Sequence, residues 1–445
     1  MQKGDRRIIR AWTMYDWANS AYSLTITSAV FPAFYVGVTQ AYGEERIAEA
    51  YGAPAASLYP WALSAGFLVI ALIAPILSGI ADHRGNKKAF LKFFCYLGAL
   101  SCASLAFFTP EHLLGGLFLV MLACIGFSGS LIFYDAFLPE IAEPADHDRV
   151  SARGYTMGYI GSVILLVVNL LMVQFPDAFH LPERVVLFGR SWDVVAARVS
   201  FLTVGLWWAG WAQIAFRHLP DGSGSTDGTN VLTSGYRELR KTWHQLRRTR
   251  RLKRFLTAFF MLNMGIQTVM YLAANFAKQE VKGLDASGQE VPITDASLIL
   301  SILIIQLVAV VGALIFVALS KRFGNVKALM IGSVVWIGAC LFAFKLHWTQ
   351  EFYALAGIVG LVMGGSQALS RSTYAKFLPE TEDHASYFSF YDVSYYLGTV
   401  LGTAAYGLVY QVTGDLRDTV VVIGSFFGLG LLLLLRVPRE EVGAA

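Results

Sequence analysis

The chain has 445 residues, of which 56% are hydrophobic and 15% are charged, with a net charge of +4 and a mean hydropathy of +0.53. This number of polar groups is too small to cover the surface of a soluble domain of this length. The composition therefore excludes a soluble globular protein and indicates one surrounded by lipid. No segment resembles a base-reading module, and we expect no nucleic-acid partner.

Each half of the chain contains six mostly apolar runs of about 18 to 25 residues, the length that an α-helix needs to cross a bilayer. We place them at residues 11–39, 58–80, 89–108, 113–134, 155–173 and 194–216, and at 255–277, 296–319, 326–344, 352–370, 387–412 and 419–435. The predicted fold class is an all-α polytopic membrane protein with twelve transmembrane helices. We divide it into an N-terminal six-helix bundle (1–217), a linker (218–254) and a C-terminal six-helix bundle (255–445).

The basic residues predict the topology. About 27 of the 35 Lys and Arg fall in the termini and in the loops on the same side as the termini, and the positive-inside rule makes that side cytoplasmic. The basic start precedes a span that is too long and too polar for a cleaved signal segment, so we expect it to be retained. Without a long luminal loop or targeting tail, we expect a multi-pass protein of a bacterial inner membrane.

The first span carries a polar stripe. Asp16, Asn19, Ser20, Ser23 and Thr27 are spaced to project from one helix face. A charged side chain within a span costs at least about 2.5 kcal/mol, so Asp16 needs a reason. We predict that the stripe faces a wet cavity and that Asp16 has a substrate, proton or gating role; the alternative is an interfacial carboxylate near the helix start.

Three other charges are expected near the cytoplasmic face. Asp135 ends the fourth span and Arg371 ends the tenth, at equivalent positions in the two halves, and a salt bridge between them would close that face. Asp392 lies one or two turns into the eleventh span, where it could compete for Arg371 or carry a proton. The alternative for all three is a static ion pair or a snorkelling end residue.

Uncharged polar residues supply further candidates for contacts with a small polar ligand. Their alternative role is interhelical hydrogen bonding. The candidates are Asn263, Gln267 and Tyr271 on the seventh span, Gln367 with Ser366 and Ser370 on the tenth, and Tyr395 beside Asp392 on the eleventh.

The linker changes character along its length. Residues 221–230 are rich in Gly, Ser, Thr and Asp and predict a flexible segment. Beyond them Tyr236, Leu239, Trp243 and Leu246 recur at helical spacing among many Arg and Lys residues, which favours a helix on the anionic inner leaflet. The alternative is a solvated basic loop that only fixes topology.

Cysteines and histidines give no sign of a metal or cofactor. All four cysteines lie in apolar spans, and the eight histidines fall in loops or at helix ends. We therefore expect no disulfide framework, no metal site and no cofactor.

An internal repeat relates the two halves. The tetrapeptide Phe-Leu-Pro-Glu at 137–140 recurs at 377–380, about 240 residues later, at an equivalent point between apolar segments. The two copies therefore run the same way and carry the same number of spans. Parallel halves of this kind are a transporter architecture.

The loop at 79–88, Gly-Ile-Ala-Asp-His-Arg-Gly-Asn-Lys-Lys, resembles the loop signature of the major facilitator superfamily. In that signature Gly85 allows a tight turn, and Asp82 can pair with a helix N-terminus or a cation in one conformation and release it in another. We therefore place Asp82 and Arg84 among the gating candidates. This copy has His83 where an arginine is usual, and the second copy, at 319–327, lacks the aspartate.

Residues 12–22, 134–142 and 365–372 narrow the resemblance to the vacuole effluxer-like branch, whose eukaryotic members are autophagy-related vacuolar amino-acid exporters. The resemblance implies two pseudosymmetric six-helix bundles, alternating access and amino-acid export. We expect a central cavity lined by the first, fourth, seventh and tenth helices. We also expect the protein to be a monomer.

The expected function is secondary active transport of a small organic solute, with an amino acid as the leading substrate and protons as a candidate coupling ion. A sugar, a drug-like amphiphile or another organic solute are alternative substrates. A non-transporting membrane sensor is the alternative from another class. An enzyme is not expected, because no nucleophile, base or metal ligands gather at one depth.

Overall fold

The computed structural model describes residues 3–187, 190–222, 231–284 and 288–438, without the side chains of 187, 190 and 231–234. The first half is built from α1 (Arg6–Ala21), η1 (Tyr22–Ala29), α2 (Val30–Tyr42), α3 (Glu44–Tyr51), α4 (Ala55–Arg84), α5 (Lys87–Ser104), η2 (Leu105–Phe107), η3 (Pro110–His112), α6 (Leu113–Asp135), α7 (Leu138–Ile141), α8 (His147–Gln174), η4 (Pro176–Phe179) and α9 (Val195–His218). The second half is built from α11 (Arg250–Glu280), α12 (Asp295–Phe323), α13 (Asn325–Lys345), α14 (Thr349–Phe377), α15 (His384–Thr413) and α16 (Leu416–Leu435), with α10 (Val231–Arg248) between the halves.

Two short antiparallel hairpins interrupt the helical order. Strands β1 (Arg184–Leu187) and β2 (Arg190–Asp193) precede α9, and β3 (Lys282–Leu284) and β4 (Glu290–Pro292) precede α12. Neither hairpin was expected from the sequence, because strands of three or four residues leave little periodicity to recognise.

The membrane-spanning helices agree with the predicted segments. Eleven described helical segments are long and apolar enough to cross a membrane. The remaining predicted segment, 387–412, is α15, a helix of 30 residues whose sequence is rich in Tyr and Ser and therefore less apolar. The chain is a multi-pass integral membrane protein.

Two helix ends differ most from the predicted ones. The tenth span was expected to end at residue 370, but α14 continues to Phe377, so Arg371 lies inside a helix. The fifth span begins at His147 rather than at 155. Both extra segments contain charged or polar residues that bond to the other half of the protein, among them Asp148 and Arg371, so a search for apolar residues misses these turns.

The first span is one continuous helical segment whose middle is a π-helix, η1. A π-helix widens the turn, and such segments are frequent at functional sites. Ser23, Thr27 and Ser28 lie in η1, and the hydroxyls of Thr27 and Ser28 donate to the carbonyl of Ser23. The polar stripe of the first span therefore crosses the π-helix.

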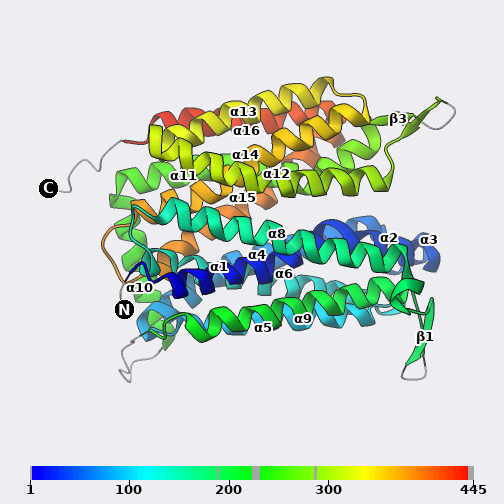
Figure 1. The fold of residues 1–445 in the computed structure, drawn as a ribbon, viewed down its shortest axis with the longest axis horizontal. Helices are drawn as coiled ribbons and strands as arrows, with labels where there is room; N and C mark the ends of the chain where they lie inside the picture. Colours follow the sequence, from blue (N-terminus) through cyan, green and yellow to red (C-terminus); the bar gives the residue numbers. More distant parts are fainter. Residues whose placement is uncertain (1–2, 188–189, 223–230, 285–287, 439–445) are drawn as a thin grey trace.

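The two halves lie side by side with their long helices along a common direction (Figure 1). Within the first half α1 packs on α8 and α9, α5 packs on α6 and α9, and α4 packs on α6. Within the second half α12 packs on α14, and α16 packs on α11 and α13. The halves meet where α4 and α6 contact α15 and where α8 contacts α12 and α14.

Close helix approach depends on small residues. The backbone carbonyls of Ile305 and Ala309 in α12 lie against Gly360 and Gly364 in α14, where a Cβ atom would collide with them. Glycine at these positions lets the two backbones approach.

Helix α10 lies at the same end of the molecule as both termini (Figure 1). It packs on α4 from the first half and on α15 and α11 from the second. The predicted amphipathic helix is therefore present and docked on protein. Residues 223–230 of the predicted flexible segment lie outside the described residues.

Candidate functional site

A cavity of about 150 Å³ lies between the two halves. Helices α1, α6 and α8 and segment η1 line it from the first half, and α11, α12, α14 and α15 line it from the second. The expected first, fourth, seventh and tenth helices all contribute, and the fifth, eighth and eleventh also do. The residues that face it are mostly polar or aromatic.

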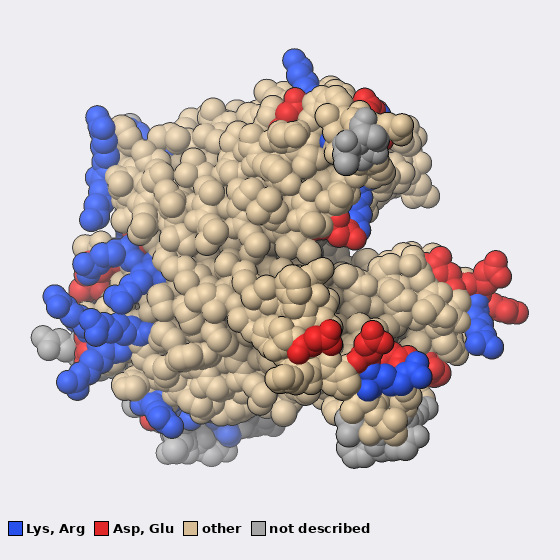
Figure 2. All heavy atoms as spheres, turned by 45° about the vertical axis from the view of Figure 1, so that its right-hand side comes forward, with Lys and Arg blue, Asp and Glu red and all other residues tan. Residues whose placement is uncertain are grey.

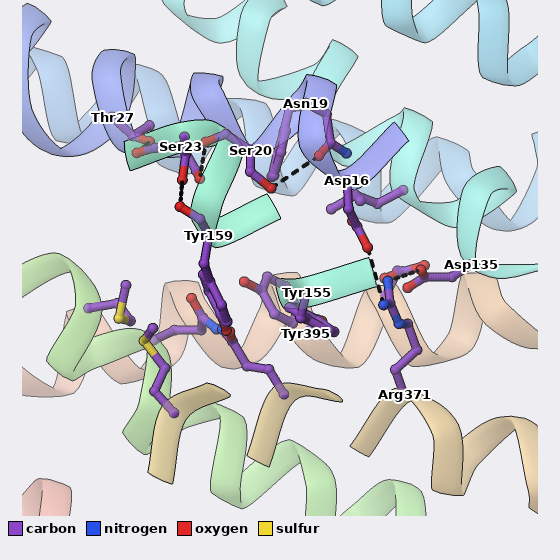
Figure 3. A pocket seen from close by; sticks show the side chains of 18 of the residues that line it. Asp16, Asn19, Ser20, Ser23, Thr27, Asp135, Tyr155, Tyr159, Arg371 and Tyr395 are labelled. Atoms are coloured by element: carbon purple, nitrogen blue, oxygen red, sulfur yellow. Dashed lines mark hydrogen bonds and ion pairs between the residues drawn. The ribbon is translucent and has the colours of Figure 1, made fainter. Parts of the chain in front are cut away.

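The structure brings most of the predicted polar residues to this cavity. Its lining contains Asp16, Asn19, Ser23, Gln267, Tyr271, Gln367 and Tyr395 from the substrate candidates, and Asp135, Arg371 and Asp392 from the gating candidates. Figure 3 shows the stripe of the first span facing Tyr159, Tyr155 and Arg371 across this space.

Asn263 is the exception among the substrate candidates. Its side-chain amide donates to the Tyr395 carbonyl at 2.8 Å and its oxygen accepts from Gln267 at 3.2 Å, and it does not line the cavity. Asn263 therefore makes an interhelical hydrogen bond, to Tyr395 on α15, which was the alternative to ligand contact.

Arg371 is the centre of a buried polar cluster beside the cavity. Its Nη1 donates to Asp135 Oδ1 at 2.9 Å, and its Nη2 lies 3.3 Å from Asp16 Oδ2. Nε donates to Ser151 Oγ, and Nη2 also donates to the Ser151 carbonyl, both at 3.0 Å. The hydroxyl of Tyr134 donates to Asp16 Oδ2 at 2.7 Å. We call Arg371, Asp16, Asp135, Tyr134 and Ser151 the Arg371 cluster.

This cluster joins the two halves, because Arg371 comes from α14 and the other four residues come from α1, α6 and α8. The Arg371 side chain is 1% exposed. Its guanidinium carbon also lies 4.2 Å from the centre of the Tyr155 ring and 4.9 Å from that of Trp12. Charge, hydrogen bonds and aromatic faces therefore all stabilise the guanidinium where it would otherwise be costly to bury.

Asp392 lies beside the same space without a partner of its own. Its side chain is buried, and its Oδ2 has no hydrogen-bond partner among the described residues. The charged groups that act on it are Asp135 and Arg371. A buried carboxyl group that lacks a cation is well suited to bind a proton or a cationic ligand.

Asp82 forms a second contact between the halves, at the basic end, by which we mean the end that carries both termini and α10. Its carboxylate accepts from the backbone N–H groups of Ser386 at 2.7 Å and Ala385 at 3.2 Å, in the first turn of α15. A carboxylate at a helix N-terminus satisfies free N–H groups and the helix dipole. Arg84, in contrast, is exposed and makes no ion pair with any described residue.

The repeated tetrapeptide takes part in the contact near Asp82. Glu140 is bound by Lys87 and, at 3.0 Å, by His384 Nδ1. Lys87 also lies 3.7 Å from Asp82 Oδ1. Glu140 therefore connects the start of α5 with the start of α15.

Asp148 is a third connection and was not foreseen. It lies in the first turn of α8 and accepts from Lys376 Nζ at 2.6 Å, Ser372 Oγ at 2.7 Å, Asn325 Nδ2 at 2.7 Å and Ser320 Oγ at 2.9 Å. The second copy of the loop signature, which lacks an aspartate, thus meets a carboxylate on the facing helix. Here the carboxylate comes from the facing helix and the second loop copy supplies donors, whereas at Asp82 the first loop copy supplies the carboxylate.

Helix α10 adds contacts at the same end. Lys241 lies 2.6 Å from Glu238 and 2.9 Å from Asp383, which directly precedes α15. Hydrogen bonds with these two carboxylates raise the pKa of Lys241. Gln245 Oε1 accepts from the Tyr387 hydroxyl at 2.9 Å. Through these contacts α10 holds the first turns of α15.

The two ends of the molecule differ. The contacts made by Asp82, Glu140, Asp148 and the Arg371 cluster close the cavity toward the basic end. Figure 2 shows Lys and Arg gathered at that end, and the surface hollowed between the halves at the opposite end. A second, more apolar cavity of about 320 Å³ shares Thr27, Ser28, Met270, Tyr271 and Gln306 with the first and extends it away from the Arg371 cluster.

Several residues of the site were missed in the sequence. Tyr159, whose hydroxyl donates to Gln367 at 2.8 Å, and Gln306 both face the cavity. Tyrosine in a membrane protein is read as an interface anchor or as core. Gln306 is the only polar residue besides Ser297 and Ser301 in the most apolar predicted span, 296–319, and that contrast could have drawn attention to it.

The described chain superposes on solved structures of major facilitator superfamily transporters. The E. coli fucose:proton symporter FucP matches over 98% of both chains with a TM-score of 0.67 and 15% identity. The proton:xylose symporter XylE, bound to a halogenated sugar, matches over 97% of this chain and 95% of its own with a TM-score of 0.70 and 14% identity. These matches show the fold, which is that of the major facilitator superfamily transporters.

Sequence comparison gives the family. The model of the family described as "Vacuole effluxer Atg22 like" matches residues 4–443, and the chain belongs to this family. An uncharacterized MFS-type transporter of Bacillus subtilis, YxiO, is 31% identical over 97% of this chain and 94% of its own. Autophagy-related protein 22 of Saccharomyces cerevisiae is 25% identical over 86% of this chain and 76% of its own. The resemblance predicted from the sequence motifs is confirmed.

Proposed function

We propose that this transporter moves an amino acid across a bacterial inner membrane by alternating access, with both termini in the cytoplasm. The observation that carries the proposal is the polar cavity on the boundary between the halves, closed at one end by contacts that cross this boundary. The family description, vacuole effluxer, supports export as the direction. The charge bias of the loops supports a cytoplasmic basic end.

In this proposal the bundles at 1–217 and 255–445 rock about the cavity. Opening toward the cytoplasm requires that Arg371 leave Asp16 and Asp135, and that Asp82 leave the N-terminus of α15. Each step exposes groups that the other half had satisfied, so the closed state is stabilised by contacts rather than by a rigid plug. Asp135, Arg371 and Asp392 are the proposed gate residues.

Coupling to protons is assigned to Asp16 or Asp392. Asp16 shares Arg371 with Asp135 and would lose its cation when the halves separate. Asp392 has no cation of its own in the closed arrangement. Protonation of either carboxyl would remove a negative charge beside Arg371 and so change the balance between the two conformations.

Anionic lipids are the proposed partners of α10. Its outer face exposes Tyr236 and Trp243 among basic residues, while Thr242 and Leu246 are buried against the protein. Basic side chains near an anionic leaflet gain about 1 kcal/mol each, and aromatic rings favour the interface. The protein is proposed to work as a monomer.

The test is transport by purified protein in liposomes. Counterflow of labelled amino acids, a sugar and an amphiphilic drug is measured with and without an imposed pH gradient. We expect amino-acid counterflow that depends on pH. If no amino acid accumulates or exchanges in a preparation that transports another solute, the substrate assignment is wrong. If Asp16→Asn and Asp392→Asn leave the rate and its pH dependence unchanged, proton coupling through them is wrong.

A further inference from the structure

The charges of the central cavity are unequal. Asp16, Asp135 and Asp392 line it, and Arg371 is the only Lys, Arg or His among the described residues of the lining. One guanidinium cannot neutralise three carboxyl groups. The cavity therefore favours a ligand, or a proton, that brings positive charge.

Arg371 is not available to an anionic group in this conformation. A guanidinium has five N–H bonds. Arg371 makes hydrogen bonds through Nε, Nη1 and Nη2 to Ser151, Asp135 and Asp16. Its faces are covered by Trp12 and Tyr155. A substrate carboxylate would have to displace contacts that already neutralise this cation.

Three buried side-chain polar atoms of the described cavity lining lack hydrogen-bond partners, and two of them are acceptors. Asp392 Oδ2 and Gln306 Oε1 are buried without a hydrogen-bond partner, and so is the donor Asn19 Nδ2. The three residues are 4%, 6% and 1% exposed, and all three line the cavity. Buried polar groups are nearly always satisfied, and because these three face the cavity, they are free to bind a ligand or water there.

We propose that the cavity binds a protonated amine, whose ammonium group is recognised by Asp392 and competes with the coupling proton for Asp392. The inference rests on the proposed transport function and adds the charge class of the substrate. An ammonium group carries three N–H donors, which suits the carboxylate of Asp392, while the Gln306 oxygen can accept from a polar group elsewhere on the substrate. Asn19 is left to donate to an oxygen elsewhere on the substrate.

The surroundings of Asp392 fit a cation. The cavity is walled by the rings of Tyr155, Tyr159, Tyr391, Tyr395 and Tyr396. Aromatic faces attract a desolvated ammonium group by about 0.5 to 2 kcal/mol. These phenols remain neutral at physiological pH. Among described residues, the charged groups that act on Asp392 are thus Asp135 on α6 and Arg371 on α14.

Competition follows from charge balance. Without substrate, Asp392 carries a proton in this proposal. When the ammonium binds, this proton leaves for water, and the ammonium takes its place beside the carboxylate. When the amine leaves, a proton takes its place. The exchange links the movement of one amine to the movement of one proton in the opposite direction, which is antiport.

The experiment is calorimetric titration of the purified full-length protein with leucine, with 3-methylbutylamine, which lacks the carboxylate, and with 4-methylpentanoate, which lacks the amine. We expect leucine and the amine to bind and the acid to bind at least about 10-fold more weakly, as expected from the loss of a charged hydrogen bond. Titration in buffers of different ionisation enthalpy should show that amine binding releases about one proton per site.

Two variants and a control make the assignment specific. Asp392→Asn should abolish proton release and weaken amine binding at least about 10-fold, and Gln306→Leu should affect it less. Asp177→Asn removes an exposed carboxylate outside the cavity and should change neither. If Asp392→Asn does not fold, proton release by the wild type decides the matter.

The inference is overturned if 4-methylpentanoate binds as tightly as 3-methylbutylamine, if amine binding releases no proton, or if Asp392→Asn binds the amine like the wild type. The proposed transport of amino acids can fail separately. Amine binding with proton release, together with an absence of amino-acid counterflow, would leave the cationic site standing and reject the amino acid as substrate.

Discussion

Arg371 Nη1 donates to Asp135 Oδ1 at 2.9 Å, although the two residues lie 236 positions apart and in different halves of the protein. By the internal repeat, the position equivalent to Asp135 is Ala375 and that equivalent to Arg371 is Leu131. Each half thus supplies one charge and has an apolar side chain where its counterpart has the other. The ion pair therefore needs both halves, because neither half carries both charges at these positions.

Arg371→Gln should lower the melting temperature and abolish counterflow, because it leaves Asp16 and Asp135 buried without a cation. Removing one partner from a buried ion pair costs about 3 to 5 kcal/mol. Thermal unfolding in detergent and liposome counterflow measure the two effects. Arg371→Lys keeps the charge but cannot reach both carboxylates and Ser151 at once, and it should retain more stability than the glutamine variant. Equal stability of wild type and Arg371→Gln would contradict this role.

Gly154→Ala should disturb the Arg371 cluster without removing any charge. A Cβ atom at residue 154 would lie within 3.0 Å of both Asp16 Oδ2 and Arg371 Nη2. We expect reduced counterflow and a lower melting temperature. Gly210→Ala is the matched control, since a Cβ there meets no atom within 4 Å, and alanine is the better helix former by about 1 kcal/mol. The prediction fails if both variants behave alike.

Asp148→Asn should loosen the basic end. The carboxylate accepts from Lys376, Ser372, Asn325 and Ser320, and an amide cannot satisfy all these donors. We expect a destabilisation of about 1 to 3 kcal/mol. Asp146→Asn is the control two residues earlier, because Asp146 pairs with the exposed Arg149 and such surface pairs contribute about 0 to 1 kcal/mol. A larger effect at residue 146 than at 148 would refute the assignment.

Lys241→Ala should release α10 from the start of α15 and make the basic end easier to open. Because Glu238 and Asp383 raise the pKa of Lys241 in the folded protein, its stabilising charge is present below the unfolded pKa of about 10.4 and is lost only as the pH rises through the folded value. The difference between variant and wild type should therefore stay the same from pH 7 to pH 9. A difference that disappears within this range would show that Lys241 is not the group involved.

The sequence was sufficient to predict the ion pair of Asp135 and Arg371. Each is a rare charge within an apolar segment, and the repeat places both near the ends of corresponding helices in the two halves. The sequence also sufficed for the stripe from Asp16 to Thr27, since helical spacing alone puts these side chains on one face. The order of the spans followed from length and apolarity, which the bilayer imposes directly.

Other features depend on tertiary contact and left no local signal. Asp148 lies among polar residues that read as a loop, and only the burial of α8 against α12 and α14 makes it a helix start. The contact of Asp16 with Arg371 needs the meeting of α1 with α14 across α8. Asn263 has the same spacing as Gln267 and Tyr271, yet α15 occupies the space in front of it.

Accessibility of single cysteines tests alternating access about the Arg371 cluster most directly. Cys95, Cys102, Cys124 and Cys340 are buried, so an introduced cysteine can be labelled selectively with a membrane-impermeant maleimide. One probe replaces Ser372, which follows Arg371 and is buried, and the other replaces Ser28, which is exposed and lines the cavity. We predict that Arg371→Gln and Asp82→Ala each raise labelling of Ser372→Cys from the basic end and lower labelling of Ser28→Cys from the opposite end. If both labelling rates stay at those of the wild-type background, the contacts do not gate the cavity and the account is wrong.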